Sequence, residues 1–480
     1  MNKITFKQNM IKLGEISLAL LCLLGAAYAQ DVPPPITTPI SKDTLILYYN
    51  PNNGFHINFT FNKVLITSGH SYVWVMPDGM LADIDGNGLL DIPFTTYGGN
   101  RAYIAYQTSL GNFNIVNVLS SSDYTYGYAI ADLNGDGRKD LVFPSNYNRV
   151  YILINTGAGF NTISFTVNPG SGVNHATSTG NLAIVSNDPF FSGGTYIYNF
   201  SLNSYISIPS LSEGIIAADI NNDGKKDIVL TSGNAAVSSP VQYYLNTGNW
   251  TSWNGPYNIT PSSTFHEVRV GDFDNDGKID IVTCNAGDDK VYIYKNNGGN
   301  PPAFSFYASI NTGSNLGTCE LQVADMDCDN DLDIVWSANY TSTANPIGWI
   351  ENLGGGSFAN HIIETGTYGV YGIGLGDINN DGRLDIAAGL GGSLYVYYRI
   401  DGPTCVTPIN FPEKPSITVS NKNVKFSYKG LKGNVFEVYS IDGKLIMKER
   451  ALNDEVEFYL HNKGVYILKY LSKFEKFVVR

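Results

Sequence analysis

The stretch GDFDNDGKIDIV, residues 271–282, places Asp272, Asp274, Asp276 and Asp280 within nine positions. Four like charges this close repel one another, so the cluster indicates a bound cation. Oxygens at positions 1, 3, 5 and 9, with a backbone carbonyl at position 7, can surround one hard ion. Ca²⁺ accepts six to eight oxygen ligands in irregular geometry, whereas Mg²⁺ demands a stricter octahedron. The stretch therefore predicts a calcium loop, closed by a left-handed turn near the glycine at position 6.

The same pattern occurs six times along the chain. Counted from the first aspartate, the copies begin at residues 83, 132, 219, 272, 325 and 377, so four of the five intervals lie between 49 and 53 residues. The remaining interval, 87 residues, contains a strand-rich segment without an acidic loop. We interpret that segment as a further repeat that has lost its loop.

Each copy predicts one Ca²⁺ site, and together the copies hold roughly half of the 43 Asp and Glu residues. Hydrated Asp-Gly hairpin turns would explain one copy but not six in the same order. We expect about six structural Ca²⁺ ions, which would offset most of the formal charge of −13. The predicted ligands, with a backbone carbonyl in fourth place, are Asp83, Asp85, Asn87, Leu89 and Asp91; Asp132, Asn134, Asp136, Arg138 and Asp140; Asp219, Asn221, Asp223, Lys225 and Asp227; Asp272, Asp274, Asp276, Lys278 and Asp280; Asp325, Asp327, Asp329, Asp331 and Asp333; and Asp377, Asn379, Asp381, Arg383 and Asp385.

The loops connect strands rather than helices. A helix–loop–helix calcium hand needs a glutamate at position 12, and the six copies have Phe94, Phe143, Leu230, Thr283, Trp336 and Ala388 there. The flanking segments EVRVGD and IDIVTC are rich in β-branched residues and predict strands. Each unit of about 50 residues continues with a Tyr-rich strand, a Gly turn and a fourth strand. This is the pattern of a β-propeller blade, so we predict an all-β fold.

The repeated core GD-x-[ND]-x-DG-x-x-D-[IL] resembles the FG-GAP/VCBS repeat family, which includes the head domain of integrin alpha subunits. The resemblance covers residues 44–402 and implies a propeller with Ca²⁺ between the first two strands of a blade. Asn330 departs from it, because glycine is usual there. Seven blades is the preferred number, with six or eight left open. We expect the segment TLILYYNPNNGFHINFTF, residues 44–61, to supply the outer strand of the last blade and close the ring.

The N-terminus predicts export. Residues 1–29 combine a basic start, an apolar core and the cleavage motif Ala27–Tyr28–Ala29, which is typical of a signal peptide. Residues 30–43 are expected to be a linker, and no later segment is long and apolar enough to be a transmembrane span. Cleavage would leave Cys284, Cys319, Cys328 and Cys405, for which export favours one or two disulfides without deciding their pairing.

A second module is expected at the C-terminus. Residues 403–412 form a Pro-marked linker, and residues 413–480 read as a small, basic β-sandwich. Its motifs Asp442-Gly443-Lys444 and Gly464-Val465-Tyr466 resemble the C-terminal sorting domain of type IX secretion cargo in Bacteroidota. The resemblance implies the secretion machinery as a partner and a secreted or cell-surface location; an ordinary immunoglobulin-like module is the alternative. The basic residues are too scattered to indicate nucleic-acid binding.

The ligand face is predicted at the ends of the inner strands opposite the acidic loops. The residues six positions before each first aspartate include Pro77 and Cys319, and the candidates from this row and its neighbours are Tyr126, Glu213, His266, Glu267, Glu320 and Tyr371. His266, Glu267 and Glu320 can be read as an acid–base site, or as polar residues that close the channel, which we favour. The sequence thus predicts a Ca²⁺-binding adhesion or binding module for a glycan or protein, and more weakly a polysaccharide-active enzyme such as a lyase.

Overall fold

The computed structural model describes residues 5–7, 44–50, 54–57 and 59–479, except residues 122–126, 146–147, 168–172, 188–193, 211, 232–237, 286, 314–316, 339–345, 367–368, 405–415, 421–422, 428–434, 441–443, 452–454, 461–463 and 471–472. The chain divides into a unit ending at Val406 and a second unit that begins at Thr407. The described residues contain strands and turns but no helix, and therefore no helix that could span a membrane.

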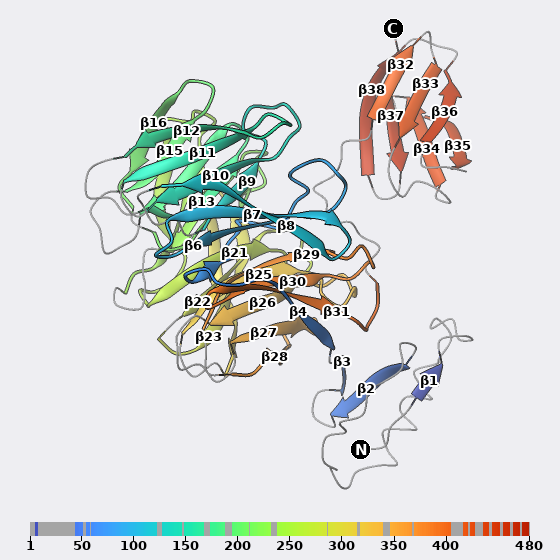
Figure 1. The fold of residues 1–480 in the computed structure, drawn as a ribbon. Helices are drawn as coiled ribbons and strands as arrows, with labels where there is room; N and C mark the ends of the chain where they lie inside the picture. The colour runs from blue at the N-terminus through green and yellow to red at the C-terminus, as the bar shows by residue number, and fades with distance from the viewer. Residues whose placement is uncertain are drawn as a thin grey trace. The chain divides into compact units, whose positions relative to one another are not determined.

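The first unit contains seven four-stranded antiparallel sheets, which confirms the predicted seven-bladed propeller (Figure 1). Each sheet is one blade, numbered here in chain order, and its first strand is innermost. The strands are β5 (Val73–Trp74), β6 (Ile92–Thr96), β7 (Arg101–Ser109) and β8 (Asn112–Ser120) in blade 1; β9 (Ala129–Ala131), β10 (Asp140–Ser145), β11 (Arg149–Asn155) and β12 (Phe160–Thr166) in blade 2; β13 (Val173–Thr179), β14 (Leu182–Asn187), β15 (Thr195–Asn199) and β16 (Ser204–Ile208) in blade 3; β17 (Ile215–Ala218), β18 (Asp227–Thr231), β19 (Val241–Asn246) and β20 (Trp253–Asn258) in blade 4; β21 (Phe265–Gly271), β22 (Asp280–Asn285), β23 (Lys290–Gly299) and β24 (Pro302–Asn311) in blade 5; β25 (Thr318–Ala324), β26 (Asp333–Ala338), β27 (Ile347–Asn352) and β28 (Phe358–Glu364) in blade 6; and β29 (Val370–Gly376), β30 (Asp385–Leu390), β31 (Ser393–Arg399) and β4 (Phe61–Thr67) in blade 7.

The ring is closed by β4, which pairs with β31 from Arg399↔Phe61 to Leu394↔Thr67. The expectation that an N-terminal segment supplies the outer strand of the last blade is confirmed, but the predicted segment was placed too early. Most of residues 44–61 lies instead in β2 (Thr44–Asn50) and β3 (Gly54–Ile57), which form a sheet with β1 (Thr5–Lys7). FNKVLIT closes the ring because Val64 and Ile66 pack against the core between blades 7 and 1.

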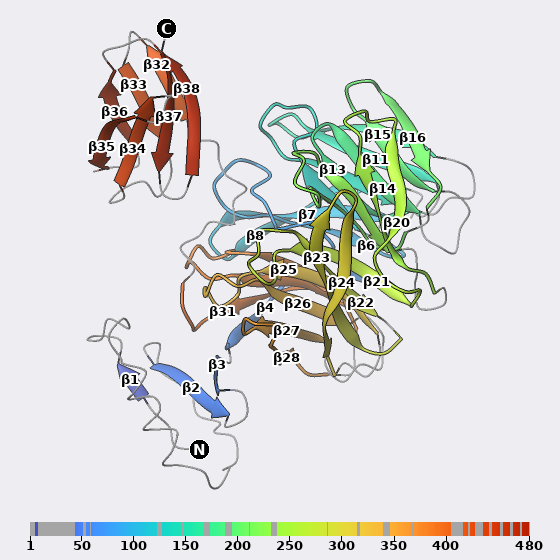
Figure 2. The ribbon, with the colours of Figure 1, turned by 180° about the vertical axis from the view of Figure 1, so that it is seen from behind.

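Apolar packing between neighbouring blades holds the ring together. Seven core clusters occur in this unit, one at each blade–blade interface. The sheets extend outward from inner strands such as β21 and β25 (Figure 2). The second strands are buried on both faces: every residue of β22 and of β26 is buried. Outer strands such as β12 alternate between partly buried and exposed positions, as expected for a sheet that faces water on one side.

Blade 3 confirms the interpretation of the long interval between loops. Its first two strands, β13 and β14, are joined by the two residues 180–181 alone, where six other blades carry the acidic loop. The blade is therefore complete in strands and lacks only the predicted metal site.

The second unit is a small β-sandwich. One sheet contains β32 (Ser416–Ser420), β33 (Asn423–Ser427) and β36 (Glu455–Tyr459). The other contains β34 (Val435–Ser440), β35 (Leu445–Arg450), β37 (Gly464–Tyr470) and β38 (Lys473–Val479). Side chains from both sheets, among them Phe426, Phe436 and Leu468, form one buried core.

Several sequence predictions fall outside the described residues. They include the apolar core and cleavage motif of the signal peptide, Tyr126 and Cys405. Of the cysteines that are described, Cys328 is disulfide-bonded and Cys284 is buried in the core between blades 5 and 6.

Candidate functional site

The six acidic loops share one hydrogen-bond pattern. The position-1 aspartate accepts the backbone N–H of position 6 at 2.7–3.1 Å in every copy. The side-chain oxygen at position 3 accepts the N–H of position 5, and that at position 5 accepts the N–H of position 7. Asparagine and aspartate oxygens take the same orientation, so the loops are equivalent in shape despite their different charge.

Left-handed backbone at positions 4 and 6 lets each loop turn back on itself. Position 6 has a φ between 75° and 87° in all six copies, including Asn330 at 75°. Asparagine tolerates this region better than most residues, because its short polar side chain can hydrogen-bond locally. The departure from glycine at Asn330 therefore leaves the loop geometry intact.

The position-9 aspartate joins the loop to the blade. In each copy its carboxylate is buried, with one oxygen accepting the N–H of position 2 and the other an N–H from the third strand. In blade 5 these bonds join Asp280 to Phe273 at 3.0 Å and to Asn296 at 2.7 Å. Burial raises the pKa of Asp280 to about 6, although both backbone bonds oppose the shift.

The loop oxygens fit a hard cation. Three loops each bring three carboxylates together with one oxygen of each within 4.8 Å of the others: Asp83, Asp85 and Asp91; Asp272, Asp274 and Asp276; and Asp325, Asp327 and Asp333. Two ligands on opposite sides of one Ca²⁺ lie up to about 5 Å apart, because each bond is about 2.3–2.6 Å long. The basic side chain at position 7 contacts the position-5 aspartate in four loops, for example Lys278 with Asp276 at 2.7 Å, and so offers the carboxylate a second cationic partner.

A side chain on the third strand ties each of five loops to the next blade. In blade 5, Asn296 donates from Nδ2 to Ile220 O of the blade 4 loop at 2.8 Å and to Ile279 O of its own loop at 3.0 Å. Four other seams have the same link to the preceding loop, made by Gln107, Asn155, Asn352 and Arg399. The loops are therefore parts of the blade–blade interface as well as candidate metal sites.

A polar group lies in the central channel where the inner strands contain β-bulges. The pairing of β21 with β22 shifts register between Phe265 and Val268, and bulges at the same level interrupt β13, β25 and β29. A bulge disturbs the alternation of side chains, so neighbouring residues need not point to opposite faces. It accounts for why His266 and Glu267, adjacent in sequence, both join the polar group.

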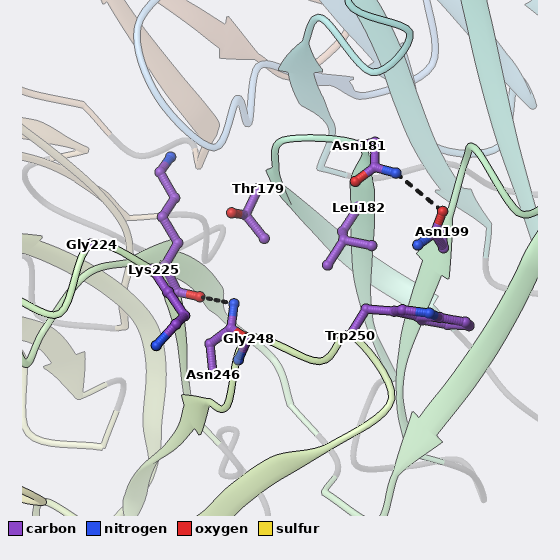
Figure 3. A pocket seen from close by; sticks show the side chains of 10 residues that line it. Thr179, Asn181, Leu182, Asn199, Gly224, Lys225, Asn246, Gly248 and Trp250 are labelled. Atoms are coloured by element: carbon purple, nitrogen blue, oxygen red, sulfur yellow. Dashed lines mark hydrogen bonds between the residues drawn. The ribbon is translucent and has the colours of Figure 1, made fainter.

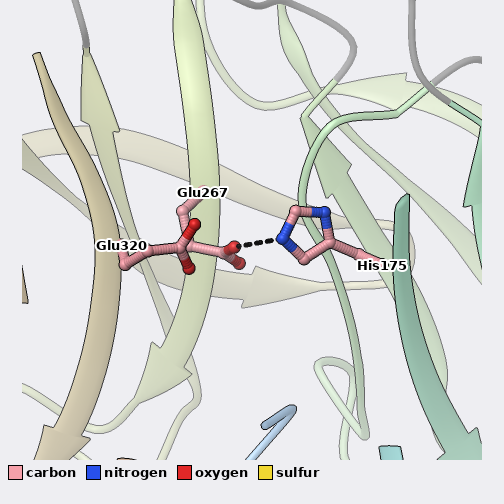
Figure 4. A group of neighbouring side chains, drawn as sticks. All are labelled: His175, Glu267 and Glu320. Carbon is pink, nitrogen blue, oxygen red and sulfur yellow. Dashed lines mark ion pairs between the residues drawn. The ribbon is translucent and has the colours of Figure 1, made fainter. Parts of the chain in front are cut away.

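Two clusters result, and Figure 4 shows His175, Glu267 and Glu320 of the deeper one. His266 Nε2 lies 3.3 Å from Glu213 Oε1. Glu267 forms an ion pair with Arg269 through one oxygen, and its other oxygen lies 3.5 Å from His175 Nε2. Glu320 belongs to the same group as His175 and Glu267. Sequence reasoning thus located Glu213, His266, Glu267 and Glu320, and missed His175 and Arg269.

The protonation states of this channel group follow from burial and its charges. Burial and the charges of His266 and Arg269 lower the pKa of His175 to about 3, so its imidazole is neutral. Burial works against the charged form of His266 too, but the hydrogen bond and charge of Glu213 raise its pKa to about 9. Burial and the neighbouring charge of Glu267 raise the pKa of Glu320 well above its usual value, which favours the neutral form of Glu320.

With Glu320 in its neutral form, the cations at His266 and Arg269 balance the carboxylates of Glu213 and Glu267. A proton-holding carboxyl beside an ionised one is an arrangement that can transfer protons. Access is poor, however, because Glu267 is 0% and Glu320 2% exposed. The geometry suits a channel wall better than a reaction centre.

An aromatic group lies across the ring from these clusters, in blades 7 and 1. It is at the end of the inner strands away from the acidic loops, which we call the channel mouth. Tyr72, Trp74, Tyr97 and Tyr371 form a closed circuit of ring contacts with centroids 5.2–6.4 Å apart. Tyr72 and Tyr97 are 47% and 39% exposed, and Tyr72 has an unusual φ of 36°. Strained backbone at a bulky residue is concentrated at functional sites. Of these four, sequence reasoning identified Tyr371 alone.

Of the two missed residues, Arg269 had a sequence signal, whereas His175 lies in blade 3, which has no acidic loop from which to count. Asp78, Glu267 and Glu320 stand five positions before the first aspartate of their loops, and Arg269 and Gln322 stand three before. Arg269 and Gln322 both donate to Pro77 O in the channel, at 3.1 and 3.0 Å. Polar and charged residues three and five positions before the first aspartate, on inner strands that are otherwise apolar, therefore indicate which side chains face the channel. The residues six positions before the first aspartate, used in the sequence prediction, identify this face only partly.

Comparison with known protein families supports the repeats. Residues 83–143, 219–283 and 272–336 match the family model of the FG-GAP-like repeat. No curated protein matches the chain. Among solved structures, PorZ, described as an essential bacterial surface component of the type-IX secretion system of Porphyromonas gingivalis, is 11% identical with a TM-score of 0.47, and the match covers 92% of this chain and 63% of PorZ. The WD40 β-propeller domain of Doa1 is 10% identical with a TM-score of 0.46, covering 70% of this chain and 97% of that domain. The chain thus carries FG-GAP-like repeats in a seven-bladed propeller.

Proposed function

We propose that this protein is an exported, Ca²⁺-stabilised propeller that serves as a binding or adhesion module for a glycan or protein at the channel mouth. The observation that carries the proposal is the half-exposed aromatic group of Tyr72, Trp74, Tyr97 and Tyr371. Aromatic rings supply large, stiff contact surfaces at low entropic cost, and tyrosine adds a hydroxyl for hydrogen bonding.

Calcium would act as a structural ion on the other face. The residues that would hold it are the 1-3-5-9 side chains and position-7 carbonyls of the six loops. Its charge would offset carboxylates that otherwise repel one another within each loop. Because five seams tie a loop to the next blade, binding there would stiffen the ring that positions the mouth.

A polysaccharide-active enzyme is the second candidate, favoured by the adjacent carboxyl groups of Glu267 and Glu320, whose pKa values are both raised by burial. One experiment distinguishes the two. The mature propeller in Ca²⁺ is applied to a glycan array and to a panel of extracellular-matrix proteins, and the same glycans are assayed for new reducing ends and unsaturated products. We expect binding without cleavage, lost in Tyr72→Ala. Cleavage that His266→Ala abolishes in a folded protein would contradict the proposal.

The second unit is proposed to direct type IX secretion, which would place the protein outside the cell or on its surface. Support comes from the sequence motifs and from its separate compact core. In a host with this secretion system, deletion of residues 407–480 should leave a folded propeller retained inside the cell. Normal export of the truncated chain would refute this role.

A further inference from the structure

Blade 3 leaves a space on the loop side of the ring. Its β13–β14 turn is two residues long, and a pocket of about 590 Å³ lies between this turn and blade 4 (Figure 3). We refer to it as the interblade pocket. It lies at the loop ends of the strands, away from the channel mouth, so it is independent of the site proposed above.

The side-chain amide of Asn246 lines the pocket and lacks one of the two acceptors that the equivalent asparagines of other blades have. Asn246 is the blade 4 counterpart of Asn155, Asn296 and Asn352, each of which donates to its own loop and to the loop of the preceding blade. Asn246 Nδ2 makes the first of these bonds, to Lys226 O at 3.0 Å. The preceding blade has no loop to accept the second, and Asn246 lines the pocket instead.

The remaining lining is preorganised and mostly polar. Asn181 Nδ2 donates to Asn199 Oδ1 at 3.1 Å on one side of the space, while the Asn246 Oδ1 atom on the other side accepts Gly248 N at 2.8 Å (Figure 3). Trp250 and Leu182 supply apolar surface between these sides. Two lysines also line the pocket: Lys226, and Lys225, whose ammonium lies 3.0 Å from Asp223.

We propose that the interblade pocket binds a neutral sugar residue. Side-chain amides offer donors and acceptors together, which is what the hydroxyls of a sugar require, and the flat face of an indole suits the C–H face of a pyranose ring. The volume lies within the range of small-ligand sites. The lining has more side-chain amides (Asn181, Asn199 and Asn246) than ammonium groups (Lys225 and Lys226), so we commit to a neutral rather than an acidic sugar.

The test uses the full mature chain in Ca²⁺ on an array of neutral and acidic glycans, with affinities then measured by calorimetry. Trp250→Ala and Asn246→Ala should each lower the affinity for a neutral sugar at least tenfold. Asn181→Ala, on the turn, gives a third variant if either fails to fold. Phe306→Ala, at an exposed aromatic residue on β24 outside both proposed sites, is the matched control and should change the affinity less than twofold. Tyr72→Ala at the channel mouth shows which of the two sites the sugar occupies.

The outcomes separate the two sites. Binding lost in Tyr72→Ala but retained in Trp250→Ala and Asn246→Ala would support the channel mouth and overturn the interblade site. An array without any neutral-sugar binding, or with acidic glycans alone bound, would also overturn it. The opposite pattern would support the interblade pocket while leaving the channel-mouth proposal without support.

Discussion

Asn296→Ala tests whether the loops bind neighbouring blades together. The Asn296 side chain is 1% exposed and makes three hydrogen bonds, to Ile220 O at 2.8 Å, to Ile279 O at 3.0 Å and from Gly298 N at 2.8 Å. Each bond contributes about 1 kcal/mol, and a buried carbonyl left without a donor adds a desolvation cost. We expect the substitution to lower the free energy of unfolding by about 3–4 kcal/mol.

The matched control is Asn246→Ala, because Asn246 keeps two of these bonds and has no link to a preceding loop. It is also partly exposed, so its loss should be smaller, about 1–2 kcal/mol. Urea unfolding in Ca²⁺, followed by tryptophan fluorescence, measures both. All five tryptophans lie in the propeller, so the signal reports this unit alone. Equal losses in the two variants, or a loss below about 1 kcal/mol for Asn296→Ala, would refute the inter-blade role.

Three further predictions concern the loops and the channel. Removing Ca²⁺ with EDTA should lower the melting temperature by several degrees or more and added Ca²⁺ should restore it; an unchanged melt would contradict the loop assignment. At pH 7, Glu320→Gln should change stability little, because burial and the charge of Glu267 already favour the neutral form of Glu320. Glu267→Gln should cost about 3 kcal/mol, because Arg269 loses its buried partner; equal losses in urea unfolding would contradict this assignment. The pKa of His266 is raised to about 9, so its pairing with Glu213 stabilises the protein in full below pH 6.5 and this stabilisation is lost as pH rises through 9. The difference in stability, roughly 3 kcal/mol at most, should be absent in Glu213→Gln. A Glu213→Gln variant with the wild-type pH profile would refute this prediction.

The fold could be read from the sequence because its evidence is repeated. The six loops fix the blade spacing, and the strands around Asp272 and Asp280 follow from β-branched residues on either side. Closure was harder to predict. Residues 44–50 and 61–67 are both plausible strands, and only pairing with β31 identifies β4 as the outer one.

The polar group in the channel and the interblade pocket could not be predicted from the sequence, because both result from three-dimensional contacts. Bulges at one level of the ring bring His175 and Glu267 together from blades 3 and 5. Local pattern cannot place a β-bulge, because the inserted residue changes direction without changing composition. The donor at Asn246 is likewise visible only by comparison with Asn155 and Asn296 in three dimensions. Repeated features can be recognised in the sequence, whereas departures from the repeat are recognised only in the structure.

The central claim is that the acidic loops bind Ca²⁺, and counting the ions tests it most directly. The mature chain is equilibrated with Ca²⁺, passed through a desalting column and analysed for metal by mass spectrometry. We predict about six Ca²⁺ per chain, and about five after Asp272→Ala, which removes the position-1 ligand of the blade 5 loop while five loops stay unchanged. A chain that retains no Ca²⁺, or a count that Asp272→Ala does not alter, would contradict the account.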